Sequence, residues 1–458
     1  MEINSDIYSL ANYGLKLIEQ NSHDLKCAEF FFEKNTYISI EIEENSVKNS
    51  ETGEDNGVSI RVINNQGALG FAFSNKLEKK TMDNLCKTAL KMMNVGTPDP
   101  DFHDLPSSFQ NYPLVNGLYD KELKALQLED SLDYINTLIE VCDNDELAIS
   151  QSGSFISNYS KTNIFNTNGL EVSGKETSCS LSSHIIVEDK TNKETSFGYE
   201  WQSERSIKAL NALNVVNTAL LEAKRNLHRK KISNMKVPLI LSPKGAIQLI
   251  LRPLASAING ESFQYKRNFL VDKRDEQIGS KLLNIEDNGL IDGAVGSAIF
   301  DGEGVPCKNK KIIEKGKFLK TGLLHNSYTA GKEGIESTGN AARSSYSSIP
   351  SIGSTNLIMR NGDTPLTEMI KDVKEGILFD YTGDNPNIST GDFSGLILHG
   401  NLILNGEIKE PLNETMIGIN LLDLYKNISS ISKEFKIYGS LHAPYVRVEN
   451  VQIIGGLN

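Results

Sequence analysis

The chain has 458 residues, enough for two or three domains of ordinary size. Its 59 acidic side chains outnumber its 47 basic ones, and the net charge of -12 argues against non-specific binding to nucleic acid or to an anionic membrane, since both favour a basic surface. With 39% hydrophobic and 23% charged residues the chain has a globular composition, which excludes a disordered or collagen-like protein.

The five cysteines are widely separated in the sequence and form no CxxC pair, which argues against a disulfide framework and a cysteine-rich zinc module. The N-terminus has no basic segment followed by an apolar run, so we expect no signal peptide. The most apolar stretch, residues 237–258, is interrupted by Pro243, Lys244, Arg252 and Pro253 and is not expected to span a membrane. These features predict a cytoplasmic protein.

The amino-terminal segment, residues 1–96, combines both hydrophobic periods. Apolar residues recur at helical spacing over 6–20 and again over 77–93, which predicts two amphipathic helices. Alternation with a period of two predicts strands between them, at 38–42, 58–62 and 69–73. The last two flank a turn at Asn64–Gly67, so this segment is expected to form a small helix–hairpin unit.

Four prolines and few aliphatic residues mark 97–113 as a linker. A second unit, 114–231, is predicted to begin with a helix over 121–141 and to end with one over 206–228. The alternating stretch between them, 147–202, is broken by polar turns and is typical of an antiparallel meander.

Beyond residue 231 the sequence changes to short strands, frequent glycines and polar turns. We therefore place the main domain boundary near residue 232, between an amino-terminal domain of residues 1–231 and a C-terminal domain of residues 232–458. The expected fold class is α+β, with the helix–hairpin unit and the antiparallel meander followed by a strand-rich domain.

Acidic residues and glycines are densest over residues 292–305. Asp301 and Glu303 in this segment could serve as an acid–base pair or hold a cation, but Asp-Gly and Glu-Gly steps also serve turns. The polar, glycine-rich stretches 337–343 and 389–395 likewise either line a cleft or form turns. The seven histidines lie far apart in the sequence and give no metal-binding motif.

Taken in order, these segments resemble the TldD/PmbA family, the "modulator of DNA gyrase" proteins that form two-subunit TldD/TldE metalloproteases. The resemblance extends over nearly the whole chain. Its motifs are Gly57-Val-Ser-Ile-Arg-Val62, Gly67-Ala-Leu-Gly-Phe71, Phe300-Asp-Gly-Glu-Gly-Val305, Lys315-Gly-Lys-Phe-Leu-Lys-Thr-Gly-Leu-Leu324, Ser327-Tyr-Thr-Ala330, Ser337-Thr-Gly-Asn340, Thr390-Gly-Asp-Phe-Ser394, Asn405-Gly-Glu-Ile408 and Val451-Gln-Ile-Ile-Gly-Gly456.

The catalytic TldD kind of chain carries an HExxxH zinc motif after a strand and a cysteine near the C-terminus. Residues five apart on a regular α-helix differ by ~140° in direction, so two such histidines can share one ion only on a widened, π-type turn. Here the motif falls on Leu251–Ser256, where Leu251 replaces the first His, Arg252 the Glu and Ser256 the second His. The C-terminal stretch, Tyr438–Pro444, has no cysteine.

The loss of all four residues resembles the PmbA/TldE kind of chain, the partner subunit without zinc. The resemblance therefore implies a non-catalytic subunit of a zinc metalloprotease that acts on unfolded peptides, with no catalytic residue, metal ligand or cofactor of its own. The zinc is expected in the partner, an HExxxH-bearing TldD-like chain in a heterodimer; the alternative partner is a second copy of this chain in a homodimer. An extended peptide is the expected substrate, with no nucleic acid or membrane partner. Candidate cleft-lining residues, from matching motifs, are Asp301, Glu303, Tyr328 and Asn340.

Two alternatives remain open on the sequence. One is a self-sufficient peptidase that uses Asp301, Glu303 or His442, which predicts cleavage by this chain alone. The other is a metal-free homodimeric binding or modulator protein, which predicts a genome without an HExxxH-bearing relative.

Overall fold

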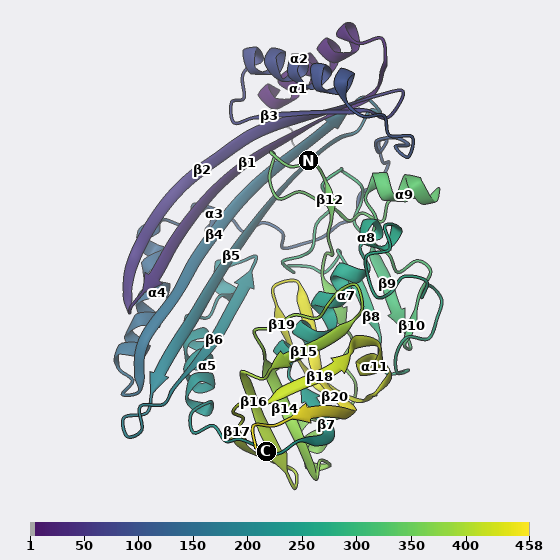
Figure 1. Cartoon of the computed structure of the whole chain (residues 1–458). Coiled ribbons are helices and arrows are strands. Elements are labelled where there is room, and N and C mark those ends of the chain that lie inside the picture. The colour runs from purple at the N-terminus through teal and green to yellow at the C-terminus, as the bar shows by residue number, and fades with distance from the viewer. Residues whose placement is uncertain (1–4, 458) are drawn as a thin grey trace.

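The computed structural model describes residues 5–457. Residues 1–4, which begin the N-terminal stretch where we expect no signal peptide, lie outside this range. The chain forms two parts: a long, curved sheet with helices at both ends, and a strand-rich part that lies along its concave side (Figure 1). This architecture confirms the predicted α+β class.

Six antiparallel strands form the amino-terminal sheet in the order β3-β2-β1-β4-β5-β6. Their bounds are β1 Leu25–Glu43, β2 Ser46–Asn64, β3 Leu69–Ser74, β4 Ala148–Asn166, β5 Glu171–Glu188 and β6 Thr195–Glu204. The predicted hairpin lies in β2 and β3, where Ile60 pairs with Ala72, and β4, β5 and β6 form the predicted meander. Because β1 also pairs with β4, the two amino-terminal units share one continuous sheet.

Strand β1 is much longer than the predicted strand at 38–42. Its first half contains Phe30, Phe31 and Phe32, all of which are buried. Both faces of the strand are covered there, so the hydrophobic residues are consecutive and no alternation marks the strand.

The helices α1 (Ser5–Asn21) and α2 (Lys79–Val95) pack against one end of this sheet, and α4 (Leu128–Asp143) and α5 (Ala212–Arg225) against the other (Figure 1). Two predicted helices are interrupted. The helix expected over 121–141 is divided into α3 (Lys121–Ala125) and α4, and the one expected over 206–228 is preceded by a 3₁₀ turn, η1 (Ile207–Ala209). Asn211 accepts a hydrogen bond from the Asn214 amide and so fixes the later start of α5.

Residues 97–113 contain neither helix nor strand, yet they pack on the sheet. Leu105 is buried, and the Asn166 side chain donates a 2.8 Å hydrogen bond to the Pro106 carbonyl. The domain boundaries proposed for this segment and for residue 232 stay predictions.

The second part is built on a mixed twelve-stranded sheet whose main path is β10-β9-β8-β13-β20-β7-β14-β16-β17. The three central strands are β20 (Leu441–Ile454), β7 (Met235–Leu241), which is antiparallel to β20, and β14 (Glu375–Tyr381), which is parallel to β7. The other strands are β8 Ile285–Asn288, β9 Asn309–Glu314, β10 Lys317–Phe318, β13 Leu357–Met359, β15 Asp392–Leu396, β16 His399–Leu404, β17 Glu407–Pro411, β18 Met416–Asn420 and β19 Ile428–Tyr438, with a separate pair β11 Ala341–Ala342 and β12 Ser351–Ile352.

One continuous helical segment follows β7 and consists of α6 (Pro243–Ala246), a π-helical turn η2 (Ile247–Leu251) and α7 (Arg252–Ala257). Its apolar side and the central strands enclose the largest hydrophobic core of the chain. The remaining helices are short: α8 Gly260–Gln264, α9 Ser327–Glu333, α10 Leu366–Lys371 and α11 Leu421–Lys426.

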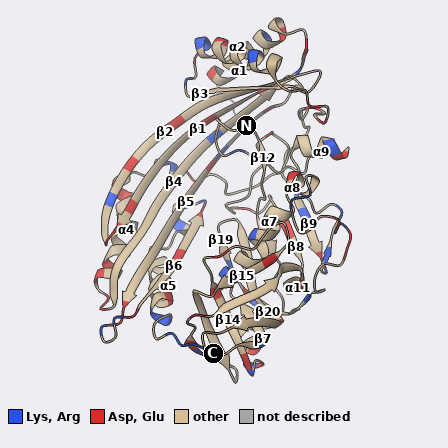
Figure 2. Cartoon of the chain, viewed as in Figure 1, with Lys and Arg blue, Asp and Glu red and all other residues tan. Residues whose placement is uncertain are grey.

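Acidic and basic residues occur in both parts of the molecule (Figure 2). Among residues 5–457, no helix has the length and apolar character needed to cross a membrane.

Candidate functional site

The helical segment after β7 contains the stretch on which the zinc motif of the family falls. Ser242 caps its start by accepting a hydrogen bond from the Gly245 amide. Pro253 cannot donate a backbone hydrogen bond, and its ring crowds the carbonyl four residues earlier, that of Leu249. The helix widens to π geometry over Ile247–Leu251, the turn that holds this carbonyl. The widened turn is thus present although the histidines are not.

The three side chains that replace the motif have different surroundings. Leu251 is fully buried and belongs to the large C-terminal core. Arg252 is exposed, and Ser256 is exposed with its hydroxyl donating to the Arg252 carbonyl at 3.3 Å. These positions therefore offer one apolar group, one cation and one hydroxyl already bonded to the helix.

These residues do not fit a zinc ion. Leu251 has no lone pair, and the Arg252 guanidinium would repel a dication. The hairpin at Tyr438–Leu441, near which the family's cysteine is expected, supplies a phenol and an aliphatic side chain. Within the described residues, no group of three or more His, Cys, Asp or Glu side chains is arranged to hold a metal.

The two degenerate segments nevertheless meet at one cavity of about 500 Å³ between the two parts of the molecule. We call it the interdomain pocket. Strands β5 and β6, helix α5, the segment 244–252, the β14–β16 connection and the β19–β20 hairpin all contribute to it. Its lining residues are His184, Phe197, Tyr199, Trp201, Glu222, Lys244, Ile247, Gln248, Arg252, Tyr381, Leu398, His399, Tyr438 and Leu441.

A buried charged group lies in the wall of the interdomain pocket. The Glu222 carboxylate is 2.7 Å from Lys244 Nζ and 3.0 Å from His399 Nδ1. Burial opposes ionisation of Glu222, but the His399 hydrogen bond and the Lys244 charge outweigh it and lower its pKa to about 2. The Nε2 atom of His399 is buried and has no hydrogen-bond partner among residues 5–457.

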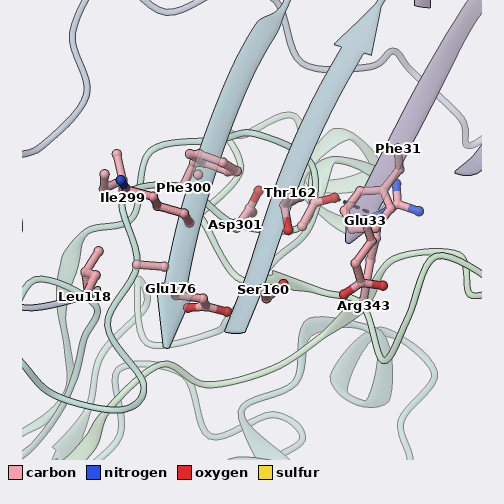
Figure 3. A pocket seen from close by; sticks show the side chains of 14 residues that line it. Phe31, Glu33, Leu118, Ser160, Thr162, Glu176, Ile299, Phe300, Asp301 and Arg343 are labelled. Atoms are coloured by element: carbon pink, nitrogen blue, oxygen red, sulfur yellow. Dashed lines mark hydrogen bonds between the residues drawn. The ribbon is translucent and has the colours of Figure 1, made fainter. Parts of the chain in front are cut away.

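Two of the residues predicted from the sequence, Asp301 and Glu303, lie elsewhere. Asp301 lines a smaller cavity of about 200 Å³, together with Phe31, Glu33 and Arg343 (Figure 3). Its carboxylate accepts hydrogen bonds from the amides of Glu303, Val305 and Ala341 at 2.8–3.0 Å, so it holds the surrounding turns. Burial and the neighbouring Glu303 charge raise the pKa of Asp301 to about 7.

Glu303 is fully buried and accepts hydrogen bonds from Arg61 and from the amide and hydroxyl of Ser327, each at 2.7 Å. Burial opposes ionisation, but the Arg61 charge outweighs it and holds the Glu303 pKa below its ordinary range. Arg61 also makes two 2.9 Å bonds to Glu29. This network joins strands β1 and β2 to the second part of the molecule.

Asn340 and Tyr328 also serve local structure. The Asn340 amide donates to Asp287 and to the Gly353 carbonyl, and its oxygen accepts from Lys310 and Thr338. Asn340 adjoins Ala341, whose amide donates a hydrogen bond to Asp301, so Asn340 and Asp301 share a neighbourhood. Tyr328 lies on α9; burial and a hydrogen bond to Asp99 raise its pKa. That these four residues line a substrate cleft stays a prediction.

His442, the third residue of the open peptidase alternative, is buried on β20. Its Nε2 atom has no hydrogen-bond partner in the described range, and burial lowers its pKa. It pairs across the sheet with Ile358 and Ile437. Its partners on the neighbouring strands are therefore apolar.

The residues of the interdomain pocket, apart from Arg252, were not singled out by sequence reasoning. One signal was available, because Phe197, Tyr199 and Trp201 alternate along β6 and so share one face of it. The others come from elements far apart in the sequence and only the fold brings them together.

The fold described above agrees with the matches that this chain has among known protein families and structures. Three family models match the chain, namely PmbA/TldA metallopeptidase domain 1 over residues 28–93, the central domain over 121–227 and the C-terminal domain over 234–455. The chain belongs to the PmbA/TldD metallopeptidase family. A metalloprotease PmbA homolog of Buchnera aphidicola subsp. Acyrthosiphon pisum is 27% identical over 465 residues, 99% of this chain and 99% of that protein.

Solved structures have the same fold. A protein from Bacteroides thetaiotaomicron described as a proposed modulator of DNA gyrase is 25% identical, with a TM-score of 0.88 over 99% of this chain and 100% of its own. TldE from Thermococcus kodakarensis is 23% identical, with a TM-score of 0.87 over 98% of this chain and 100% of its own. The expected family and fold are thereby confirmed.

Proposed function

We propose that this chain is a PmbA/TldE-type subunit of a zinc metalloprotease, without a zinc site of its own, that pairs with an HExxxH-bearing TldD-like chain. The partner supplies the zinc and the general base, and this chain completes the chamber that admits an extended peptide. Pairing of the chain with itself as a homodimer is the alternative to this heterodimer.

The observation that carries this proposal is the surroundings of the degenerate motif. Leu251 is part of the core and Arg252 presents a cation where a general base would be needed. A carboxylate is the group that activates a zinc-bound water, and a guanidinium cannot accept its proton. The full-length similarity to a metalloprotease PmbA homolog supports the same assignment.

The test is reconstitution. This chain and the HExxxH-bearing relative from the same genome are purified separately, mixed, and assayed on an unfolded, fluorescently labelled polypeptide. We expect no cleavage by this chain alone, cleavage by the mixture, and a complex of both chains on size exclusion. Changing the Glu of the partner's motif to Gln should abolish cleavage, because the zinc-bound water then loses its base.

A matched pair of variants distinguishes the proposed function from the self-sufficient peptidase alternative. Asp301→Asn and His442→Gln in this chain should leave the chemical step of the mixture in place, provided that the folded state is retained. Cleavage by this chain alone that disappears in either variant would overturn the proposal. A genome without an HExxxH-bearing relative would favour the binding-protein alternative.

A further inference from the structure

Among the described residues, one cation of the interdomain pocket has no partner that neutralises its charge. Of the two cationic side chains in its wall, Lys244 is paired with Glu222 at 2.7 Å and lies 3.7 Å from Glu200. The guanidinium of the other, Arg252, has no hydrogen-bond or ion-pair partner within residues 5–457, and the residue is exposed. The pocket therefore has one guanidinium free to bind an anion.

The walls of the pocket are aromatic. Phe197, Tyr199 and Trp201 project from one face of β6, and Tyr381 and Tyr438 face them from the second part of the molecule. The Phe197 ring centroid lies 4.2 Å from that of His399 and that of Trp201 lies 5.8 Å from Tyr438. Such walls favour a flat or bulky apolar group beside the anion.

We infer that the interdomain pocket binds the C-terminal end of a peptide, with the free carboxylate on Arg252 and an aromatic last side chain against Trp201 and its neighbours. The peptide nature of the ligand rests on the proposed function, which this inference deepens by naming the part of the substrate or product that this chain holds.

Two features of charge favour a carboxylate over a phosphate, and the size of the cavity favours a short segment. A single unpaired guanidinium matches a single negative charge, and its two parallel N–H groups match the two oxygens of a carboxylate. The Lys244–Glu222 pair in the same wall is neutral and offers no second positive charge to a dianion. A cavity of about 500 Å³ is of a size for one or two residues and not for a folded partner.

The chain itself provides the probe. Trp201 is its single tryptophan and lines the pocket, so fluorescence excited where tyrosine does not absorb reports on this pocket alone. The intact chain, without its partner, is titrated with N-acetyl-glycyl-phenylalanine and with the same dipeptide as its C-terminal amide. We expect a saturable change in emission with the acid. The amide should bind at least roughly tenfold more weakly than the acid, because hydrogen bonds to charged groups contribute most to such discrimination.

Two substitutions of Arg252, and a matched removal of an arginine charge outside the pocket, provide the controls. Arg252→Gln should reduce binding of the acid to the level of the amide, whereas Arg252→Lys should retain part of the preference, since it keeps the charge without the paired N–H groups. Arg267→Gln, which removes an exposed guanidinium stacked on Tyr265 outside the pocket, should bind as the unchanged chain does. Circular dichroism of each variant verifies that it is folded.

Equal affinity for acid and amide, acid binding that survives Arg252→Gln, or no change in Trp201 emission with either dipeptide would each overturn the inference. The assay needs neither zinc nor the partner. If the dipeptide acid does not bind selectively but the protease is reconstituted, this pocket's role is rejected and the proposed function stands. If the acid binds selectively but reconstitution fails, the proposed function is rejected and the pocket's preference for a carboxylate stands.

Discussion

Arg61 of strand β2 donates a 2.7 Å hydrogen bond to Glu303, 242 residues further along the chain in the strand-rich part. Both side chains are almost completely buried. Arg343, from the same part as Glu303, also contacts Glu29 on β1. The acidic segment that invites a catalytic interpretation thus joins the two parts of the fold through a buried ionic network.

Arg61→Met should therefore destabilise the protein strongly. Removing one partner of a buried ion pair leaves uncompensated charge, here on Glu29 and Glu303, and typically costs about 3–5 kcal/mol. Urea unfolding measures the change. Arg360→Met, which removes an ion pair to Glu286 whose Arg side chain is 57% exposed, is the control and should cost less than about 1 kcal/mol. Equal effects of the two substitutions would contradict the role given to the network.

Leu251→Ala should cost about 2–5 kcal/mol in the free energy of unfolding, because a fully buried leucine is replaced and a cavity is left in the core. Ser256→Ala, at the other end of the degenerate motif, should change stability by no more than about 0.5 kcal/mol since its hydroxyl is exposed. Thermal or urea unfolding distinguishes the two. A neutral Leu251→Ala would indicate that this side chain is not the core residue described above.

The pH dependence of stability should carry a contribution from Glu222. Its pKa in the folded protein, about 2, lies below the ordinary value of 4.5, so its contribution is complete above about pH 5 and is lost as the pH falls toward 2. The contribution is up to about 3 kcal/mol. The stability difference between the unchanged chain and Glu222→Gln should therefore shrink by that order between pH 5 and pH 2. A difference that stays constant over this range would show that Glu222 is not held ionised by Lys244 and His399.

All five cysteines are buried and free, and burial raises the pKa of each thiol to about 12. Thiolates are the reactive form, so the folded protein should resist thiol reagents. Titration with Ellman's reagent should find no rapidly reacting thiol in buffer and five in denaturant. A rapidly reacting thiol in the folded chain would point to an exposed thiolate near the surface and would reopen the question of a metal ligand.

Elements with a regular hydrophobic period could be predicted from the sequence. The helix at 77–93 corresponds to α2, and the alternation at 58–62 and 69–73 to the paired strands β2 and β3. The pairing of β1 with β4 could not be predicted, because it joins residues more than a hundred positions apart, such as Phe30 and Phe165, that carry no local signal for each other.

Of the candidate site, only the loss of the zinc-binding residues could be predicted from the sequence. That Leu251, Arg252 and Ser256 cannot bind zinc follows from their side chains alone. That Leu251 points into the core while Arg252 lines a pocket with Trp201 depends on the helix geometry and on packing between distant segments. The sequence pattern of Asp301 and Glu303 indicates a pair of carboxylates, but their hydrogen bonds to amides and to Arg61 can be seen only in the folded chain.

The most direct test of the central claim is the zinc content of this chain, expressed without a histidine tag, purified alone and measured by elemental mass spectrometry after dialysis. A chain whose motif positions hold Leu251, Arg252 and Ser256 should retain less than about 0.1 zinc per molecule, since a stable site needs at least three protein ligands. One zinc per chain that survives dialysis would contradict the account, and its ligands would then have to be found among histidines that only a second copy of the chain could bring together.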